Sequence, residues 1–383
     1  MGRAVTLKDV GERVGLTAAG VSLALRGSAS IPEHTQRRVA AAAAALGYVP
    51  NAAARALRTR RQHAIGLLVC DPEKEKPLGH FAAAVLAVAE EAMRRDHALV
   101  LLRLTEPGPA AATADGAAGR DDRREREARA AAAAAALLAR TPVDGLVCVG
   151  AFGPARAAQL RAVAATGLPY AFIGERELDG TPVPHATTDY ARGSRLAVEH
   201  LARLGHRRIA LAVDPRTRDL PTIAARLDGY RDALRALGLD GSAELRLPWE
   251  DAAAGDRAAG ARNARRLRET GATAVYAVYG NTTRRVLLDL QGAGVAVPQT
   301  VAVVGFGDFP GAASLPPPLT TVRQPFDRLG AAAARLVFAG LAGESPVWPV
   351  VLEPDLVVRE SCGAAAAGLR RRPPPADEDL PWE

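Results

Sequence analysis

Apolar and polar residues alternate along most of the chain in blocks that predict strands and helices in turn. Apolar runs with the length of a buried strand recur from residue 64 to residue 306, and Ala-, Leu- and Arg-rich stretches at helical period separate them. Strict alternation of this kind predicts parallel sheets with right-handed crossovers. The expected strands are 64–69, 98–102, 144–150, 170–174, 208–213, 274–279 and 301–306.

The N-terminal segment contains helix signals and no strand signal. Each of three short amphipathic stretches begins at a residue that suits a helix start and ends at a glycine. About three residues separate the first two stretches, which is typical of a helix-turn-helix. The start and end residues are Thr6 (with Asp9 as its acidic partner) and Gly15, Thr17 and Gly27, and Pro32 (as first helical residue) and Gly47.

The second of these helices is expected to enter the major groove of DNA, which is about 12 Å wide and admits one helix. Its residues are mostly small or apolar, so we expect contacts with thymine methyls and hydroxyl contacts rather than bidentate arginine–guanine pairs. The expected base-facing residues are Thr17, Ala18, Ala19, Ser22 and Leu23, with phosphate contacts from Arg13, Arg26, Thr35 and Arg37. Thr6 and Leu7 complete the expected DNA-binding set.

The charge of the chain is concentrated in this segment. Residues 1–61 hold 10 Lys and Arg against 3 Asp and Glu, a net +7, and the remaining 39 basic and 39 acidic residues cancel. A basic segment of this kind favours an anionic partner, and its affinity should depend steeply on salt. The alternative is a small helical bundle with a solvated basic face.

The sequence YVPNAAARALRT at residues 48–59, together with the preceding helix-turn-helix, resembles the lactose repressor family of bacterial regulators. The resemblance implies a hinge helix in the minor groove at the centre of a palindromic operator. In it Asn51 caps the helix, Ala54 lies against the groove floor and Leu57 is a wedge between base pairs; alone, Leu57 would suit an ordinary core position. A helix of about eight residues is unstable by itself, so we expect it to fold with DNA and a partner subunit.

The resemblance continues through HLARLGHRRIAL (200–211), GYRDAL (229–234), VPQTVAVVGFGD (297–308) and PPLTTVRQP (317–325). The fold class it implies is α/β: a helix-turn-helix headpiece (1–50), a hinge helix and linker (51–62), and a periplasmic-binding-protein-like core (63–360) of two doubly wound parallel-sheet subdomains. Crossings near Gly174, Asp308 and Pro325 would give a first lobe of about 63–173 and 309–325 and a second of about 174–308 and 326–360.

A small-molecule effector would bind in the cleft between the lobes, at the carboxyl ends of the strands. Arg226 matches the family position whose guanidinium holds an effector hydroxyl or carboxylate, although an arginine at a helix start can also be a surface residue. Phe81 falls where the family places an aromatic on the ligand, but a core phenylalanine would look the same. With the strand-end residues, the expected effector set is Asp71, Phe81, Arg226, Tyr279 and Asn281.

Two departures from the family pattern concern this cleft. Tyr279 and Gly280 stand where relatives commonly carry Asn-Asp, whose carboxylate binds sugar hydroxyls. The loop from Asp71 to Phe81 is longer and more charged than usual. Losing an acceptor carboxylate disfavours the standard pyranose mode. Three alternatives follow for this cleft: a carbohydrate effector, an atypical effector, or loss of the ligand switch.

Other function classes lack their motifs. The seven histidines form no metal motif, no nucleophile elbow is present, and Pro310 interrupts the glycine-rich stretch 305–311, so we expect no enzyme activity, metal or cofactor. Three distant cysteines suit a reducing cytoplasm, and no apolar run suits a membrane. Residues 105–135 predict a mobile loop followed by an Arg- and Ala-rich helix, and 361–383 a disordered tail without a tetramerising heptad repeat.

The sequence thus predicts a cytoplasmic, homodimeric transcriptional regulator, most simply a repressor, which binds a pseudo-palindromic double-stranded operator and responds to a small molecule. The alternative is a cytoplasmic small-molecule binding module whose DNA binding is residual or independent of ligand.

Overall fold

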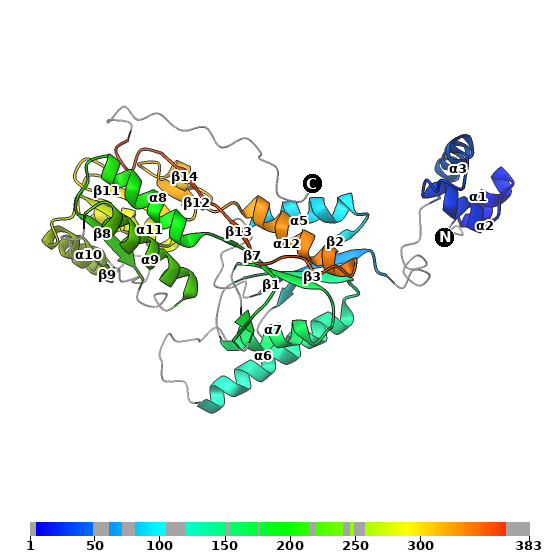
Figure 1. Cartoon of the computed structure of the whole chain (residues 1–383), viewed down its shortest axis with the longest axis horizontal. Coiled ribbons are helices and arrows are strands. Elements are labelled where there is room, and N and C mark those ends of the chain that lie inside the picture. Colours follow the sequence, from blue (N-terminus) through cyan, green and yellow to red (C-terminus); the bar gives the residue numbers. More distant parts are fainter. Residues whose placement is uncertain are drawn as a thin grey trace. The chain divides into compact units, whose positions relative to one another are not determined.

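The computed structural model describes residues 5–48, 61–70, 81–104, 120–150, 154–174, 177–178, 180–214, 220–239, 246–248 and 257–364. The chain divides into an N-terminal unit, Met1–His63, and a core unit, Ala64–Glu383 (Figure 1). Among the described residues, no helix combines the length and the apolar character needed to cross a membrane.

The described residues of the N-terminal unit form the helices α1 (Leu7–Val14), α2 (Ala18–Leu25) and α3 (Glu33–Leu46). The glycines that end α1 and α3 adopt the left-handed conformation, as the sequence predicts. Pro32 differs from the prediction, because its extended backbone makes it the N-cap and the helix begins one residue later. The helices pack around a small apolar cluster formed by Val10, Val21, Ala24, Val39 and Ala43.

The first sheet of the core is entirely parallel, as the alternation of strands and helices predicts, with strand order β13-β7-β4-β3-β1-β2. A short antiparallel hairpin, β5 (Glu177–Leu178) and β6 (Thr181–Pro182), lies outside it. The strands of the first sheet are β1 (Ala64–Cys70), β2 (Ala98–Leu104), β3 (Gly145–Gly150), β4 (Tyr170–Ile173), β7 (His185–Thr188) and β13 (Val350–Leu352).

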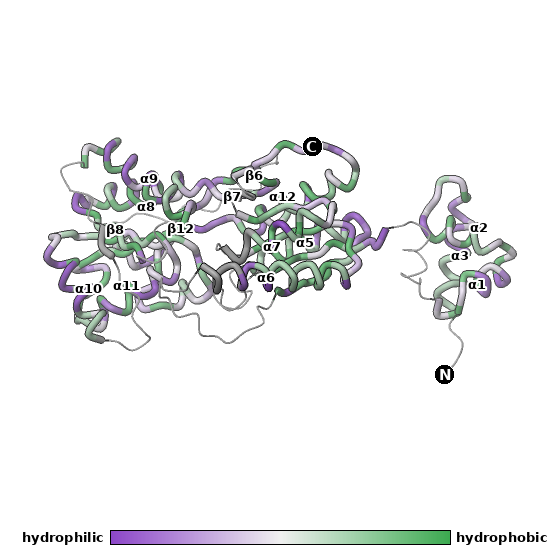
Figure 2. Tube along the Cα trace, turned by 90° about the horizontal axis from the view of Figure 1, so that it is seen from below, coloured by the Kyte–Doolittle hydropathy of each residue, from purple (hydrophilic) through white to green (hydrophobic). Residues whose placement is uncertain are grey.

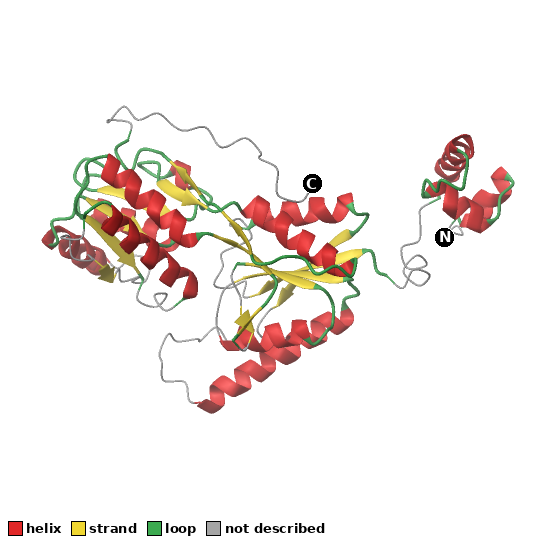
Figure 3. Ribbon diagram, in the orientation of Figure 1, coloured by secondary structure: helices red, strands yellow, loops and turns green. Residues whose placement is uncertain are grey.

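Helices cover both faces of this sheet (Figures 1 and 3). Ile65 and Leu67 face one side and pack with α5 (Ala82–Arg94) and α12 (Phe326–Leu341). Leu68 points to the opposite side and packs with α6 (Arg120–Arg140) and α7 (Pro154–Ala164). The sheet is therefore doubly wound, and its inner strands β1, β3 and β4 are largely apolar because helices cover both of their faces.

The second sheet has the order β14-β12-β11-β10-β8-β9, and β14 alone runs antiparallel to its neighbour. Its strands are β8 (Ile209–Val213), β9 (Arg246–Pro248), β10 (Ala274–Ala277), β11 (Ala302–Phe306), β12 (Thr320–Arg323) and β14 (Asp355–Val357). A 3₁₀ turn, Ala312–Ser314, links β11 to β12.

This sheet is also covered on both faces. The helices α8 (Tyr190–Arg203) and α9 (Pro221–Ala236) pack on one face. The helices α10 (Arg257–Glu269) and α11 (Gly280–Gly292) pack on the other. Much of α10 is hydrophilic (Figure 2), whereas its Ala264 and Leu267 pack in one apolar cluster with residues of β8, β10 and β11. The two sheets, each between two layers of helices, agree with the predicted fold class.

The path between the two lobes differs from the expected path. Strand β7 still belongs to the first sheet, so the chain first leaves that lobe at Asp189 and not near Gly174. Strand β12 pairs with β11 in the second sheet, so there is no crossing near Asp308. The crossing near Pro325 leads into α12, which packs on the first sheet, and the third crossing lies between β13 and β14.

The expected lobe assignments of 174–188, 309–325 and 326–352 are therefore wrong. Hydrophobic patterning identifies an apolar helix or strand but not the sheet against which it packs, and the two lobes offer similar apolar faces. The first lobe contains the described residues of 64–188 and 326–352, and the second those of 189–323 and 355–364.

Two further expectations can be compared with the structure. The helix expected at the end of the 105–135 segment is present as α6, while residues 105–119 lie outside the described residues.

The tail was expected to begin at residue 361, but Ser361, Cys362 and Ala364 are buried against the second lobe. The core therefore extends to at least residue 364, and residues 365–383 lie outside the described residues.

The close approach of α8 and α9 depends on Gly229. A Cβ atom at this position would lie 2.6 Å from the Cα of Ala191. We expect Gly229→Ala to destabilise the core by about 1–3 kcal/mol, because backbone and not a flexible side chain must move. Gly292→Ala is the matched control, since nothing lies within 4 Å of that position. Thermal unfolding of the two variants checks this, and equal midpoints would contradict the packing.

The stability of the core is expected to decrease in mild acid because of His200. This side chain is buried, with Nε2 3.2 Å from Cys362 Sγ, and burial and then the charges of Arg203 and His206 lower its pKa to about 4. The unfolded chain therefore binds more protons than the folded chain between about pH 6.5 and 4, so stability is lost as pH falls through this range.

The expected loss from His200 is at most about 3 kcal/mol. Comparing the unfolding midpoints of the wild type and His200→Gln from pH 7 to pH 4 measures it. The variant should show a shallower decline, whereas His34→Gln, at an exposed position of the N-terminal unit, should match the wild type. A decline of equal steepness in His200→Gln would refute the assignment.

Candidate DNA-binding interface and effector site

Local hydrogen bonds cap the starts of α1 and α2. The Thr6 backbone N–H donates to Asp9 Oδ2 at 2.7 Å, and the Asp9 N–H donates to Thr6 Oγ1 at 3.4 Å, which completes the capping box expected from the sequence. The Gly20 N–H donates to Thr17 Oγ1 at 3.1 Å, so Thr17 caps α2 as expected. Three residues separate the two helices, which is the spacing of a helix-turn-helix.

One face of α2 is left outside the apolar cluster of the N-terminal unit. Val21 and Ala24 point into that cluster and fix the rotation of the helix. Thr17, Ala18 and Ala19 are exposed at its start. The face continues at helical spacing through Ala19, Ser22, Leu23 and Arg26.

Within this face, Ser22 and Arg26 contact each other. Arg26 Nη1 donates to Ser22 Oγ at 3.1 Å, and Ser22 is largely buried while Arg26 is exposed. Leu23 is half-buried and is not a member of the apolar cluster. Of the expected base-facing residues, Thr17, Ala18 and Ala19 are thus exposed and Leu23 is half-buried, whereas Ser22 is buried beneath Arg26, so the surface is small and largely apolar with a basic end.

The other expected contacts of the N-terminal unit are placed less uniformly. Thr6 is exposed, but its side chain is engaged in the capping box, and Leu7 packs against the apolar cluster. Thr35 is half-buried beside His34, with Oγ1 3.1 Å from the histidine Nε2. Asn51, Ala54 and Leu57 lie outside the described residues.

The second lobe has a topological switch point between β8 and β10. The chain leaves β8 toward β9 on one side, and β10 then adds on the other side of β8. In doubly wound sheets ligands bind beyond the carboxyl ends of the strands at such a point. Arg226 of α9 and Tyr279, the N-cap of α11, both lie at this end of the sheet.

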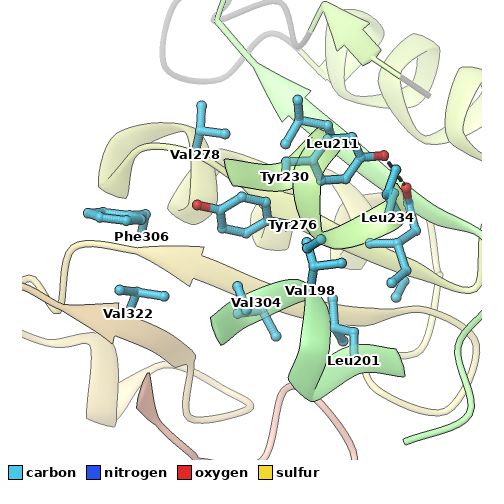
Figure 4. Packing of buried hydrophobic residues seen from close by; sticks show 14 of the residues in the cluster. Val198, Leu201, Leu211, Tyr230, Leu234, Tyr276, Val278, Val304, Phe306 and Val322 are labelled. Carbon is cyan, nitrogen blue, oxygen red and sulfur yellow. Dashed lines mark hydrogen bonds between the residues drawn. The ribbon is translucent and has the colours of Figure 1, made fainter. Parts of the chain in front are cut away.

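Arg226 is buried, with 4% of its surface exposed, and its Nη1 donates to the backbone oxygen of Val278 at 3.0 Å. Its guanidinium carbon lies 4.0 Å from the ring centroid of Phe306 and 4.7 Å from that of Tyr190. Tyr276 and Phe306 lie with Tyr230 on one side of the second sheet (Figure 4). Arg226 is therefore held against an aromatic wall at the end of the strands.

The remaining expected effector residues are dispersed. Asn281, in the first turn of α11, is exposed, and 38% of the surface of Tyr279 is exposed beside it. Phe81 belongs to the first lobe, where it is the N-cap of α5 and packs edge-to-face on Phe326 with ring centroids 5.1 Å apart. Asp71 lies outside the described residues.

Sequence reasoning missed the two aromatic residues that contact Arg226. Phe306 is the last residue of β11, and Tyr190 is the first residue of α8, close after β7. Each could have been found from its position, because a large aromatic at the carboxyl end of a parallel strand faces the region where ligands bind.

Comparison with known proteins relates both units to one group. Residues 6–51 match the model of the bacterial regulatory proteins of the lacI family, and residues 198–362 match the periplasmic binding protein-like domain. The HTH-type transcriptional regulator CelR of Thermobifida fusca is 32% identical over 367 residues, which span 94% of this chain and 98% of CelR.

Solved structures give the same picture. The complex of the transcriptional regulator CelR with cellobiose superimposes with a TM-score of 0.57 at 29% identity and covers 93% of this chain and 99% of the other. The dimer of the lac repressor bound to operator and an anti-inducer has a TM-score of 0.66 at 24% identity, with 94% and 99% covered, which shows a shared fold.

The exposed face of α2 predicts the effect of a single charge. Leu23→Arg should change the base preferred at one position of each half-site, because arginine binds guanine through two hydrogen bonds. Ala41→Arg, on the exposed side of α3, adds the same charge elsewhere and should strengthen binding to all sequences alike. Selection from random DNA checks both, and an unchanged motif for Leu23→Arg would rule out the placement of α2 in the groove.

Proposed function

The chain belongs to the lacI family of bacterial regulatory proteins and is a DNA-binding transcriptional regulator, and we propose that it is a repressor controlled by a small molecule. It binds a pseudo-palindromic operator as a homodimer, because twofold symmetry of the protein requires twofold symmetry of the site. The observation that carries this proposal is the free face of α2, which is held at its start by the Thr17 cap and by burial of Val21 and Ala24.

In the proposed complex, α2 lies in the major groove of each half-site. Its small side chains permit close approach to the bases, and Arg26 with the other basic residues of the N-terminal unit binds phosphates. Sequence discrimination by this helix is modest, since few of its residues can make paired hydrogen bonds to a base. Much of the affinity is therefore electrostatic and falls as salt is added.

The hinge segment 51–62 supplies the second part of the recognition. Asn51 caps a short helix, Ala54 allows it to approach the floor of the minor groove, and Leu57 inserts between base pairs at the centre of the operator. Insertion of an apolar side chain unstacks a base step and kinks the duplex. Because so short a helix needs DNA and a partner to form, it is a suitable element for an effector to control.

The proposed effector site lies at the switch point of the second lobe, around Arg226 and Tyr279. The related regulator CelR has been solved with cellobiose. A ligand here changes operator binding only by its difference in affinity between the DNA-bound and free conformations. The proposed role is binding without catalysis, as in the regulators that this chain resembles.

Leu57→Ala should weaken operator binding by roughly ten- to a hundredfold, because the apolar wedge is lost. Titration of an operator obtained by selection measures the effect, and thermal unfolding should be unchanged. Leu237→Ala, the same truncation at a partly exposed position of the core, should bind as the wild type does. Equal operator affinity of Leu57→Ala and the wild type would support the alternative of a small-molecule binding module with residual DNA contacts.

A further inference from the structure

The buried cation at the proposed effector site has no acidic partner. Among the described residues, no salt bridge joins Arg226 to a carboxylate, and its Nε is buried without a hydrogen-bond partner. The guanidinium makes one hydrogen bond, from Nη1 to the backbone oxygen of Val278. A guanidinium stays charged under all ordinary conditions, so this position holds a positive charge with unused donors.

The carboxylates at the same end of the second lobe are engaged elsewhere. Asp308 is held by Arg323 and Arg359, and Asp189 accepts the Arg192 N–H at 2.7 Å and caps α8. Asp214, which follows β8, is buried but forms no salt bridge with Arg226. The other titratable groups near the guanidinium are the hydroxyls of Tyr190, Tyr276 and Tyr279, which carry no charge near neutral pH, and burial lowers the pKa of Arg226.

Other buried charges of the core are paired with side chains of opposite charge. Arg285 pairs with the buried Asp289 through Nε and Oδ1 at 2.7 Å, and Glu91 is surrounded by three arginines. A buried charge is costly unless it is paired and fully hydrogen-bonded. Stacking on Phe306 and Tyr190 offsets part of the cost at Arg226, but it leaves the hydrogen-bond donors unused.

The two helix starts near Arg226 differ in the donors that they offer. Neither N-cap, Leu220 of α9 or Tyr279 of α11, forms a side-chain capping bond, but α9 begins with Pro221, which has no N–H, so only α11 begins with an uninterrupted set of backbone N–H groups. Gly280 and Gly307 carry no side chain, and a Cβ at Gly280 would lie 3.2 Å from Phe309. A neutral sugar donates several hydrogen bonds and is best bound by acceptor carboxylates, and among the described residues at this end of the second lobe Asp189 and Asp308 are already engaged.

We propose that the effector is an organic anion whose carboxylate or phosphate group is bound by Arg226, with an apolar or sugar body against Tyr279. This inference rests on the proposed effector role of the site. An anion would supply the missing counter-charge and accept hydrogen bonds from Nε and from the start of α11. The aromatic wall of Phe306 and Tyr190 fixes the plane of the guanidinium and so sets the direction from which the anion approaches.

The first experiment compares two substitutions in the full chain without ligand. Arg226→Met should raise the midpoint of thermal unfolding in dilute chloride buffer, because an unpaired buried charge is replaced by an apolar side chain of similar length. Arg285→Met is the matched control and should lower it, because Asp289 loses its partner. If Arg226→Met lowers the midpoint as much as Arg285→Met does, Arg226 is a structural residue and the inference is overturned.

The second experiment uses matched probes, namely inorganic phosphate, gluconate and glucose 6-phosphate against glucose and cellobiose. We expect the anions to raise the unfolding midpoint of the wild type more than their neutral counterparts do. In Arg226→Met the half-saturating concentration of each anion should rise by roughly tenfold or more. Arg285→Met should keep the wild-type preference, which separates loss of the site from general loss of positive charge.

The possible outcomes separate this inference from the proposed function. Stabilisation by cellobiose or glucose that is lost in Arg226→Met, without a matching effect of the anions, keeps the effector site and overturns the anionic ligand. Equal responses of the wild type and Arg226→Met to all probes overturn both the inference and the role of Arg226. DNA binding by the N-terminal unit, tested through Leu57→Ala, is unaffected by either result.

Discussion

Both sheets of the core must be covered on both faces, and this requirement determines where chemistry can occur. Strands such as β3 and β8 are buried from end to end, so they can carry no exposed polar group along their length. Polar and charged side chains are therefore restricted to the helix surfaces and to the loops beyond the strand ends. At the switch point of the second sheet, Arg226 and Tyr279 are brought together from helices that follow two neighbouring strands.

The core also shows how it normally accommodates buried charge. Glu91 joins α5 to α12 through Arg335, and Asp308 joins the end of β11 to Arg323 and Arg359. Burial by itself favours the protonated form of these carboxyl groups and raises the pKa. In both clusters the neighbouring arginines outweigh this effect and hold the pKa of the carboxyl group below its ordinary value. Arg226 breaks this pattern, since its burial is accompanied by aromatic rings instead of acids.

Local elements could be predicted from the sequence because their causes are local. Thr6 and Thr17 cap the first two helices through side-chain oxygens, and the apolar runs at 64–69 and 301–306 become central strands. The lobe to which β7 and α12 belong could not be predicted. His185–Thr188 is a short polar strand without an apolar run, and the Ala- and Leu-rich face of α12 would suit either sheet.

The candidate site could be predicted only in part for a related reason. Arg226 was identified through its place in a motif, and the structure brings Tyr279 near it, since Arg226 donates to the backbone oxygen of Val278, the residue before Tyr279. Phe306 and Tyr190 were missed, because their contacts with Arg226, across 80 and 36 positions of the sequence, depend on how strands are ordered in the sheet. The order β14-β12-β11-β10-β8-β9 has no signature in local hydrophobic patterning.

The three crossings between the lobes have a consequence for biosynthesis. The first sheet lacks its β13 edge, and α12 cannot cover its face, until residue 352 has emerged from the ribosome. Proteins fold domain by domain from the N-terminus as they are made, but here the earlier lobe must wait for nearly the whole chain. The short N-terminal helices, whose contacts are local, can assemble long before that. A nascent chain would therefore possess its DNA-reading helices well before it possesses a completed sensor.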